Sequence, residues 1–199
     1  MPKGKELLAA LQRTEQQLQV FQKISRFMVR DLSLAEVLQG IVSLVVDFTA
    51  CDSCLVYLID GGELVLCASN TPHPSVIGKL RLKLDEGLTG WVARERRLVS
   101  ISREAYKDPR FKNFSELPED TYESFLSAPV IARNRVVGVI NVQHRLPHQH
   151  SGGDMELLTT VGEQVGCLLA LARLGPAAAE SANHVQLVLS STPAHPRGA

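Results

Sequence analysis

Hydrophobic side chains recur at alternating intervals of four and three residues near the start of the chain. Good helix formers fill the positions between them, and no proline follows Pro2 before residue 30. This pattern predicts a helix over residues 4–30 with a heptad seam, as in helices that pair in a coiled coil. Polar residues within the seam weaken it, so the alternative is an amphipathic helix lying on its own domain. We expect both, with the early turns projecting and the later turns docking. The seam consists of Leu7, Leu11, Thr14, Leu18, Phe21, Ser25 and Met28.

Two further helices are predicted from the same periodicity. Ser33 and Glu36 have the spacing of a capping box, so a second helix should begin there and run to about Phe48. A last helix is predicted over residues 154–174, where apolar residues are again spaced by three and four. The seam of this last helix consists of Leu158, Val161, Val165, Leu168 and Ala172.

The middle of the chain has the shorter apolar runs of β-strands. Residues 53–60 and 63–68 flank Gly61-Gly62, which predicts a hairpin with a tight turn. Residues 125–132 and 136–144 predict a second hairpin, with Asn134 able to adopt a left-handed conformation in its turn. Short strands are expected at 80–84 and 98–101, a turn at 85–90, a short helix at 91–96, and a long loop at 102–122.

The order of these elements predicts an α+β domain. Two hairpins favour a mostly antiparallel sheet, with helices segregated on its faces. We expect an N-terminal helix over residues 1–30, one folded domain over residues 31–174, and a disordered tail over residues 175–199, which is rich in Pro, Ala and Ser.

Composition narrows the class of protein. Lys and Arg together number 21, as do Asp and Glu, so the formal net charge is zero. Nucleic-acid-binding proteins usually carry a basic excess or stripe, and none is visible here. The chain shows neither a secretory signal nor an apolar run of the length that crosses a membrane, roughly 18 residues. We therefore expect a cytoplasmic protein with no nucleic-acid or membrane partner, and with reduced cysteines.

Candidate metal and redox residues are few. Cys51 and Cys54 form a C-x-x-C pair, but the second half of a zinc site is missing and the pair opens a strand, which favours buried free thiols. His144, His148 and His150 form a tract in which metal binding or pH sensing is possible. The loop setting around them favours an exposed connection instead. We expect no metal and no cofactor.

Four segments together resemble the GAF domain in order and spacing: residues 41–60, 87–93 (GLTGWVA), 108–111 (DPRF) and 125–142. The similarity spans about residues 20–174. It is greatest to the GAF domains of nitrogen-type phosphotransferase-system enzyme I and of bacterial antiterminator-type regulators. The resemblance implies a central sheet of about six strands with a helical layer on one face and pocket-roofing loops on the other. It also implies dimerisation through the first and last helices, with candidate interface residues Leu11, Leu18, Phe21, Leu158, Val161, Val165 and Leu168.

The implied pocket lies between the inner face of the sheet and residues 85–129. For Trp91 the simpler interpretation is core packing, and for Asp108, before Pro109, it is turn formation. The three aromatic residues of the 102–122 loop need burial, either under a lid or against a ligand. The candidate ligand-binding residues are Trp91, Tyr106, Asp108, Phe111, Phe114, Phe125 and Ser127.

The chain also departs from the GAF subclasses with known chemistry. It lacks the signature of cyclic-nucleotide-binding members, and residues 86–90 lack the cysteine of free-methionine-sulfoxide reductases. The pocket loops also lack a bilin-attaching cysteine. We therefore expect a non-catalytic sensory module that binds an unidentified small molecule and passes its state through the helices of a homodimer, with an output protein as a possible partner. The alternatives are a dimeric interaction scaffold with a vestigial pocket and, third, a reductase.

Overall fold

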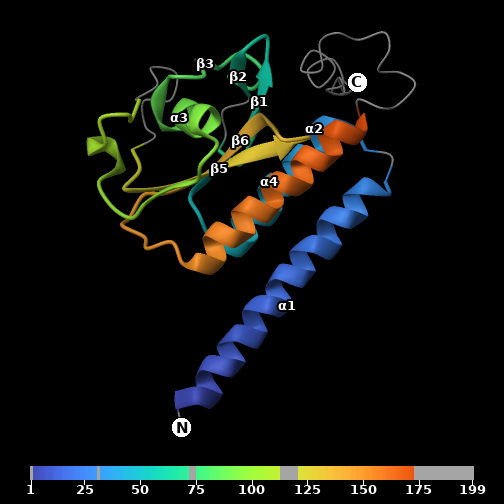
Figure 1. The fold of residues 1–199 in the computed structure, drawn as a ribbon, viewed down its shortest axis with the longest axis vertical. Coiled ribbons are helices and arrows are strands. Elements are labelled where there is room, and N and C mark those ends of the chain that lie inside the picture. Colours follow the sequence, from blue (N-terminus) through green and yellow to red (C-terminus); the bar gives the residue numbers. More distant parts are fainter. Residues whose placement is uncertain (1, 31, 72–74, 113–120, 173–199) are drawn as a thin grey trace, which may run out of the picture.

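The computed structural model describes residues 2–30, 32–71, 75–112 and 121–172. Within these ranges the chain forms a six-stranded antiparallel sheet in the order β3-β2-β1-β6-β5-β4, with helices on both faces (Figure 1). The predicted α+β class is confirmed. The expected disordered tail and the candidate residue Phe114 lie outside the described residues.

Both predicted hairpins are present and form most of the sheet. Gly61 and Gly62 have φ of 60° and 86°, and the turn of the second hairpin places Arg133 and Asn134 at 48° and 60°. Two successive left-handed residues match the right-handed twist of the flanking strands, so both turns favour the hairpin. The strands are β1 (Ser53–Asp60), β2 (Glu63–Ser69), β3 (Arg81–Lys83), β4 (Val99–Ile101), β5 (Ser124–Ala132) and β6 (Arg135–His144).

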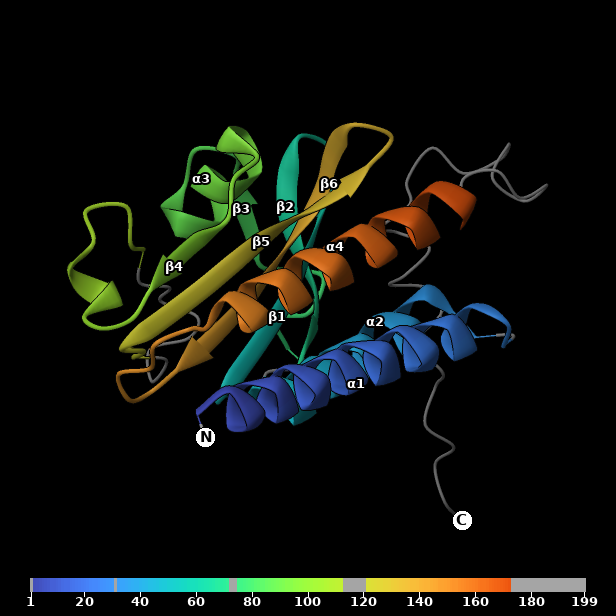
Figure 2. The same ribbon diagram turned by 60° about the horizontal axis from the view of Figure 1, so that its bottom comes forward.

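Three long helices lie on one side of the sheet: α1 (Pro2–Met28), α2 (Leu34–Thr49) and α4 (Gly152–Ala172) (Figure 2). Helices α2 and α4 pack on the sheet, and α1 packs against these two helices. The capping box predicted at the start of α2 is confirmed. Glu36 N donates to Ser33 Oγ (3.3 Å), while Ser33 N donates to Glu36 Oε2 (2.8 Å). Unpaired backbone N–H groups at the start of a helix need such partners, so the box sets where α2 begins.

Alternation along the strands divides the apolar side chains into two cores. Even-numbered residues of β1 pack toward the three long helices, and odd-numbered residues pack toward the opposite face. The helix-side core includes Leu38, Ile41, Val56, Leu126, Ile140 and Val142. The core of the opposite face, which we call the roof-side core, includes Leu55, Tyr57, Leu66, Leu88, Val92, Phe125 and Val139.

The apolar seam predicted on the last helix faces the sheet of its own chain. Leu158, Val161 and Val165 are 0%, 1% and 0% exposed and belong to the helix-side core. Gly162 lets α4 approach β5 closely, since a Cβ there would lie 2.8 Å from the Pro129 carbonyl oxygen. These three residues are therefore core residues, and assigning them to a dimer interface was wrong. Spacing by three and four fits a coiled-coil seam and a sheet-packing stripe equally well.

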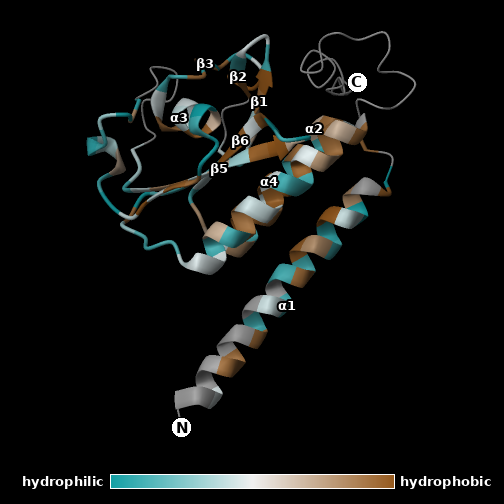
Figure 3. Ribbon diagram, viewed as in Figure 1, coloured by the Kyte–Doolittle hydropathy of each residue, from teal (hydrophilic) through white to brown (hydrophobic). Residues whose placement is uncertain are grey.

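Helix α1 has two different apolar faces. Val20 and Ile24 are each 1% exposed and dock the second half of the helix on the domain, where Gln17 Nε2 also donates to Glu156 Oε2 (3.2 Å). On a second face of α1, large apolar side chains are exposed to solvent. Figure 3 shows hydrophobic segments of α1, coloured brown, in its projecting part. The exposed members of this second face are Leu7 (73%), Leu8 (57%), Leu11 (59%), Leu18 (56%) and Phe21 (41%). No helix in the described part of the chain is long and apolar enough to cross a membrane.

The short helix on the roof side begins earlier than predicted. The structure has α3 (Gly87–Glu95) where the sequence predicted a turn at 85–90 and a helix from Trp91. The glycines that suggested a turn have another role. Gly90 allows the helix to lie against β3, because a Cβ at this position would lie 2.6 Å from the Lys83 carbonyl oxygen.

Candidate functional site

The candidate site lies between α3 and the sheet, on the face opposite the three long helices (Figure 1). Leu88 and Val92 of α3 are buried in the roof-side core, and Phe125 from β5 meets the same core from the sheet. The apolar layer holds α3 in place and surrounds a smaller group of polar side chains.

A chain of hydrogen bonds crosses this layer from the sheet to α3. Ser127 Oγ donates to Asn141 Oδ1 (2.7 Å), and Asn141 Nδ2 donates to Thr89 Oγ1 (2.8 Å). These side chains are 0%, 1% and 6% exposed, respectively. Ser127 and Asn141 are direct partners in the β5–β6 register, so the strand pairing itself brings their side chains together.

Two further polar side chains on the sheet are buried without partners among the described residues. Among these residues Ser53 Oγ forms no hydrogen bond and Gln143 Oε1 accepts none. Ser53 is 0% exposed and Gln143 is 7% exposed. Ser53 and Gln143 are direct partners in the β1–β6 register. By alternation along β6, Gln143 lies on the same face as Asn141. A buried polar atom without a hydrogen bond costs free energy, so this pair is where a ligand or an ordered water would gain most.

A charged edge lies beside α3. The Arg110 guanidinium stacks over the Trp91 ring at 4.6 Å and forms two hydrogen bonds to Asp108, of 2.9 and 2.8 Å. Lys112 Nζ pairs with Glu86 Oε1 at the start of the helix. The Arg110 hydrogen bond lowers the pKa of the Asp108 carboxyl, and the Lys112 hydrogen bond lowers that of Glu86. Both carboxylates are therefore ionised at neutral pH. Asp108 orients Arg110 over Trp91, and Glu86 binds Lys112 of the 108–112 segment to the start of the helix.

The structure brings some of the predicted pocket residues together. Trp91 and Phe111 are partly buried against the roof-side core, Phe125 is 3% exposed within it, and Ser127 lies in the buried polar chain. Tyr106 remains at the surface with 40% exposure, so it is not buried under a lid, and its burial against a ligand stays a prediction.

Sequence reasoning missed most of the polar residues of the site. Thr89, Asn141, Ser53 and Gln143 were not proposed, and neither was Arg110. A signal was present for the strand residues, because polar side chains at alternate positions of an apolar strand mark a polar patch on one face. Arg110 carried no such signal, since its contact with Trp91 joins the 108–112 segment to a helix.

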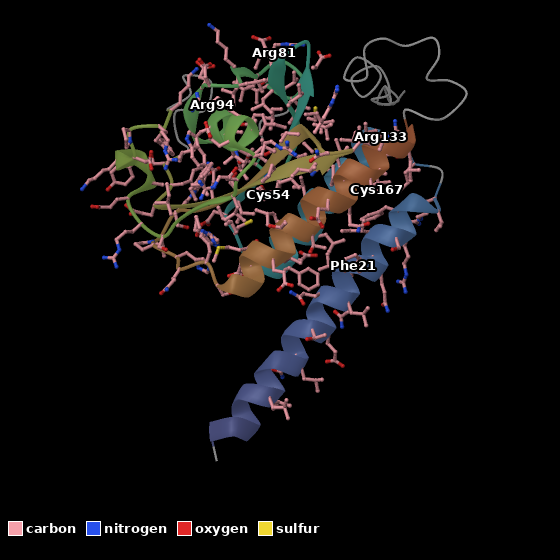
Figure 4. All side chains as sticks on the ribbon, viewed as in Figure 1. Phe21, Cys54, Arg81, Arg94, Arg133 and Cys167 are labelled. Atoms are coloured by element: carbon pink, nitrogen blue, oxygen red, sulfur yellow. The ribbon has the colours of Figure 1, made fainter. Side chains whose placement is uncertain are left out.

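Three of the four thiols lie in the helix-side core, on the opposite face of the sheet from this polar group, and they are poorly reactive. Cys51, Cys54 and Cys67 are buried, and none of the four cysteines forms a disulfide. Burial raises the pKa of the Cys51 thiol, raises that of Cys54 well above its ordinary value, and raises that of Cys67 to about 12. Cys167 is exposed on α4, on the helical layer (Figure 4). The thiolate is the reactive form of cysteine, so the buried thiols are poorly suited to redox chemistry.

The histidine tract is not an exposed connection. His144 and His150 are 7% and 6% exposed, and His148 is half-buried beside them. The rings contact one another because the segment after β6 turns back over the end of that strand. The expectation of a solvent-facing tract was wrong, because the sequence does not reveal this reversal.

A separate pocket of about 390 Å³ lies at the far end of the second hairpin. Its lining includes Arg133 and Arg135 from the β5–β6 turn and Leu169 from α4. Figure 4 shows Arg133 near the C-terminal end of α4, away from α3. Of the predicted ligand-binding residues that the structure describes, none lines this pocket.

The chain is similar to known proteins along most of its length. A family model described as GAF domain matches residues 31–170. The GAF domain of a phosphoenolpyruvate-protein phosphotransferase from Coxiella burnetii superposes with a TM-score of 0.75 at 26% identity, covering 82% of this chain and 98% of that one. The equivalent domain from Acinetobacter gives 0.72 at 29% identity, with coverages of 79% and 95%.

Two further proteins are similar to this chain, one in part of its sequence and one in its fold. The Escherichia coli protein named phosphoenolpyruvate-dependent phosphotransferase system is 27% identical over 93 residues, which cover 47% of this chain and 12% of the relative. The chain therefore matches only a small part of that protein. A free methionine-R-sulfoxide reductase from Neisseria meningitidis shares the fold, with a TM-score of 0.66 at 16% identity, and covers 81% of this chain and 90% of that one.

Proposed function

The chain belongs to the GAF domain family, and from this premise we propose that it is a small-molecule-binding regulatory module rather than an enzyme. One observation carries the proposal. Ser53 Oγ and Gln143 Oε1 are buried opposite each other without hydrogen bonds among the described residues, on the sheet face that α3 covers. A bound polar ligand would supply the missing partners and regain the free energy that their burial costs.

The surrounding residues favour a small, polar ligand. The buried chain from Ser127 to Thr89 supplies hydroxyl and amide groups, and the roof-side core supplies apolar walls. A few polar groups within an apolar concave layer are typical of small-ligand sites. The 108–112 segment lies at the edge of this layer, where Arg110 stacks on Trp91 and Lys112 pairs with Glu86.

Homodimerisation through α1 is the second part of the proposal. Leu11, Leu18 and Phe21 stay exposed on α1 although Val20 and Ile24 dock the same helix. Burying such a stripe against a second copy is favourable, at about 25 cal/mol per Å² of apolar surface. A ligand that binds one arrangement of α1 more tightly would shift the dimer toward it, and a separate output protein would read that shift.

A dimeric scaffold with a vestigial pocket is the competing function. The packing of Trp91 and Phe111 against the roof-side core favours it, since side chains of the protein itself occupy much of the space beneath the roof. In that case the α1 interface alone would be the function, and the chain would bind no small molecule.

A reductase is disfavoured by the state of the thiols. The raised pKa values of Cys54 and Cys67 keep both protonated at neutral pH. We expect an aromatic disulfide reagent to react with one thiol per native chain, Cys167, and with all four in denaturant. Rapid reaction of a second native thiol would return the enzyme hypothesis to consideration.

A thermal-shift screen with nucleotides, amino acids and 2-oxo acids tests ligand binding. A ligand at about 100 times its Kd stabilises by about 2.7 kcal/mol, which raises the Tm of a domain of this size by roughly 5–10 °C. Gln143→Leu removes the unpartnered amide oxygen and should abolish the shift. The exposed Gln19→Leu variant on α1 is the matched control and should retain it. A broad library without effect, together with a dimer in light scattering, would favour the scaffold instead.

A further inference from the structure

Three imidazole rings meet where β6 passes into α4. His144 is the last residue of β6, His148 lies in the connection, and His150 comes two residues before α4. The His144 and His148 rings stack at 4.0 Å with 9° between their planes, and the His150 ring lies 5.0 and 5.4 Å from them. One nitrogen from each ring lies within 4.8 Å of the other two.

Separate backbone anchors hold the three rings. His144 is paired with Ser124 in the β5–β6 register, and His148 N donates to the Ser102 carbonyl oxygen (2.9 Å). Next to His150, Ser151 N donates to Asp154 Oδ2 (2.7 Å) and fixes the start of α4. The cluster therefore results from the fold, and little further ordering is needed to bring the rings together.

Hydrogen bonds indicate which nitrogens face the centre of the cluster. His144 Nε2 lies 3.4 Å from the Thr49 carbonyl oxygen, which can only accept, so in the neutral ring Nε2 carries the proton and Nδ1 has the free lone pair. Ser124 Oγ lies 3.3 Å from that Nδ1 and 3.5 Å from His150 Nε2. Two nitrogens thus converge on one hydroxyl. A histidine whose second nitrogen donates to a backbone carbonyl is the usual arrangement of a metal ligand.

We propose that His144, His148 and His150 bind one zinc ion, with His144 Nδ1 and His150 Nε2 among the ligand atoms. Three imidazoles with an open fourth position for water form a ligand set that zinc accepts, and imidazole suits zinc far better than magnesium or calcium. The ion would join the end of β6, the connection and the start of α4.

The geometry needs only a small adjustment. In a tetrahedron with Zn–N bonds of about 2.0–2.1 Å, ligand nitrogens lie about 3.4 Å apart. The present limit of 4.8 Å therefore has to shrink by roughly 1.4 Å at most. Residues 147–151 form no regular strand or helix, so His148 can tilt out of its stack without disturbing β6 or α4.

Zinc titration of the tag-free, chelator-treated full chain tests this site, with a chromophoric chelator as competitor. We expect one zinc per chain. His148→Gln should weaken binding by at least about 100-fold, more than the loss of a partner outside the ligand set usually costs. His148 is half-buried, so this variant should keep the circular dichroism spectrum of the parent. The control is His73→Gln, which changes a histidine that is not among the three proposed ligands, and it should bind zinc as the parent does.

Cobalt substitution distinguishes imidazole ligands from thiolate ligands. Imidazole ligation gives visible d–d bands without thiolate-to-cobalt charge transfer, and His150→Gln should abolish these bands. Any one of three results would overturn the proposal: a chain that binds no zinc, unchanged affinity in folded His148→Gln and His150→Gln, or charge-transfer absorption from a thiolate. Loss of binding in His73→Gln would do the same, since it would place the site elsewhere.

Discussion

Ser53→Ala should stabilise the ligand-free protein, although most substitutions at fully buried positions destabilise. The Ser53 hydroxyl is buried and has no hydrogen-bond partner among the described residues. Burial of an unpartnered hydroxyl costs about 1–3 kcal/mol, and the variant removes that cost. Loss of the oxygen's packing contacts offsets part of the gain, so we expect a net increase of about 1 kcal/mol in the free energy of unfolding.

Ser127→Ala is the matched control, and its effect should have the opposite sign. Ser127 and Ser53 are both 0% exposed and occupy the same sheet, but Ser127 Oγ donates to Asn141 Oδ1 at 2.7 Å. Removing that donor leaves the amide oxygen buried and unpartnered, which should destabilise by about 1–3 kcal/mol. The same chemical change thus separates a satisfied hydroxyl from an unsatisfied one.

Urea unfolding measures both variants. With a slope of about 2 kcal/mol per M, the midpoint should rise by roughly 0.5 M for Ser53→Ala and fall by roughly 0.5–1.5 M for Ser127→Ala. A midpoint for Ser53→Ala that falls as far as that of Ser127→Ala would contradict this prediction. It would mean that the Ser53 hydroxyl is fully hydrogen-bonded, so that a ligand would gain nothing by pairing with it.

Three further predictions address α4, α1 and the charged edge. Gly166→Ala should destabilise by about 1–3 kcal/mol in urea unfolding, because its Cβ would overlap the Ile131 carbonyl oxygen, whereas Gly152→Ala at an open position should have no such cost. Leu18→Glu should convert the proposed dimer to a monomer in light scattering with the fold intact, while Gln19→Glu should not, and an unchanged mass for Leu18→Glu would contradict dimerisation through α1. Asp108→Asn should reduce the loss of unfolding free energy at acid pH. Arg110 lowers the pKa of the native Asp108 carboxyl from 3.8, so the pair stabilises the fold above that pH, and this contribution is lost as the pH falls. Equal losses for parent and variant between pH 7 and pH 3 would exclude a stabilising pair.

Local signals in the sequence predicted the elements well. The capping box at Ser33 and the two hairpin turns lie at the positions that the sequence predicts, because each depends on residues only a few positions apart. The start of α3 was misplaced for the opposite reason. Gly90 suggested a turn, but its role is to admit the backbone of β3, a contact that no local pattern reveals.

Heptad spacing predicted helices but not their partners. On α4 the stripe of Leu158, Val161 and Val165 packs on β5, and on α1 the stripe through Leu11 and Leu18 stays exposed. Both have the same intervals. The glycines of α4 lie against the sheet, where Gly162 and Gly166 leave room for the backbone of β5. Two glycines four residues apart also allow two helices to approach each other, so this spacing does not by itself assign α4 to the sheet.

The candidate site was only partly predictable because it depends on strand register. The sequence predicted a site made mainly of aromatic residues. Its polar group instead comes from three strands and consists of Ser53, Ser127, Asn141 and Gln143. Alternation alone places the two β6 residues on one face, since they are two apart. Pairing β6 with both β1 and β5 then brings each of them opposite a serine. A predicted hairpin supplies the second pairing, but the first joins two strands that lie far apart in the chain, so that half of the site follows only from the folded sheet.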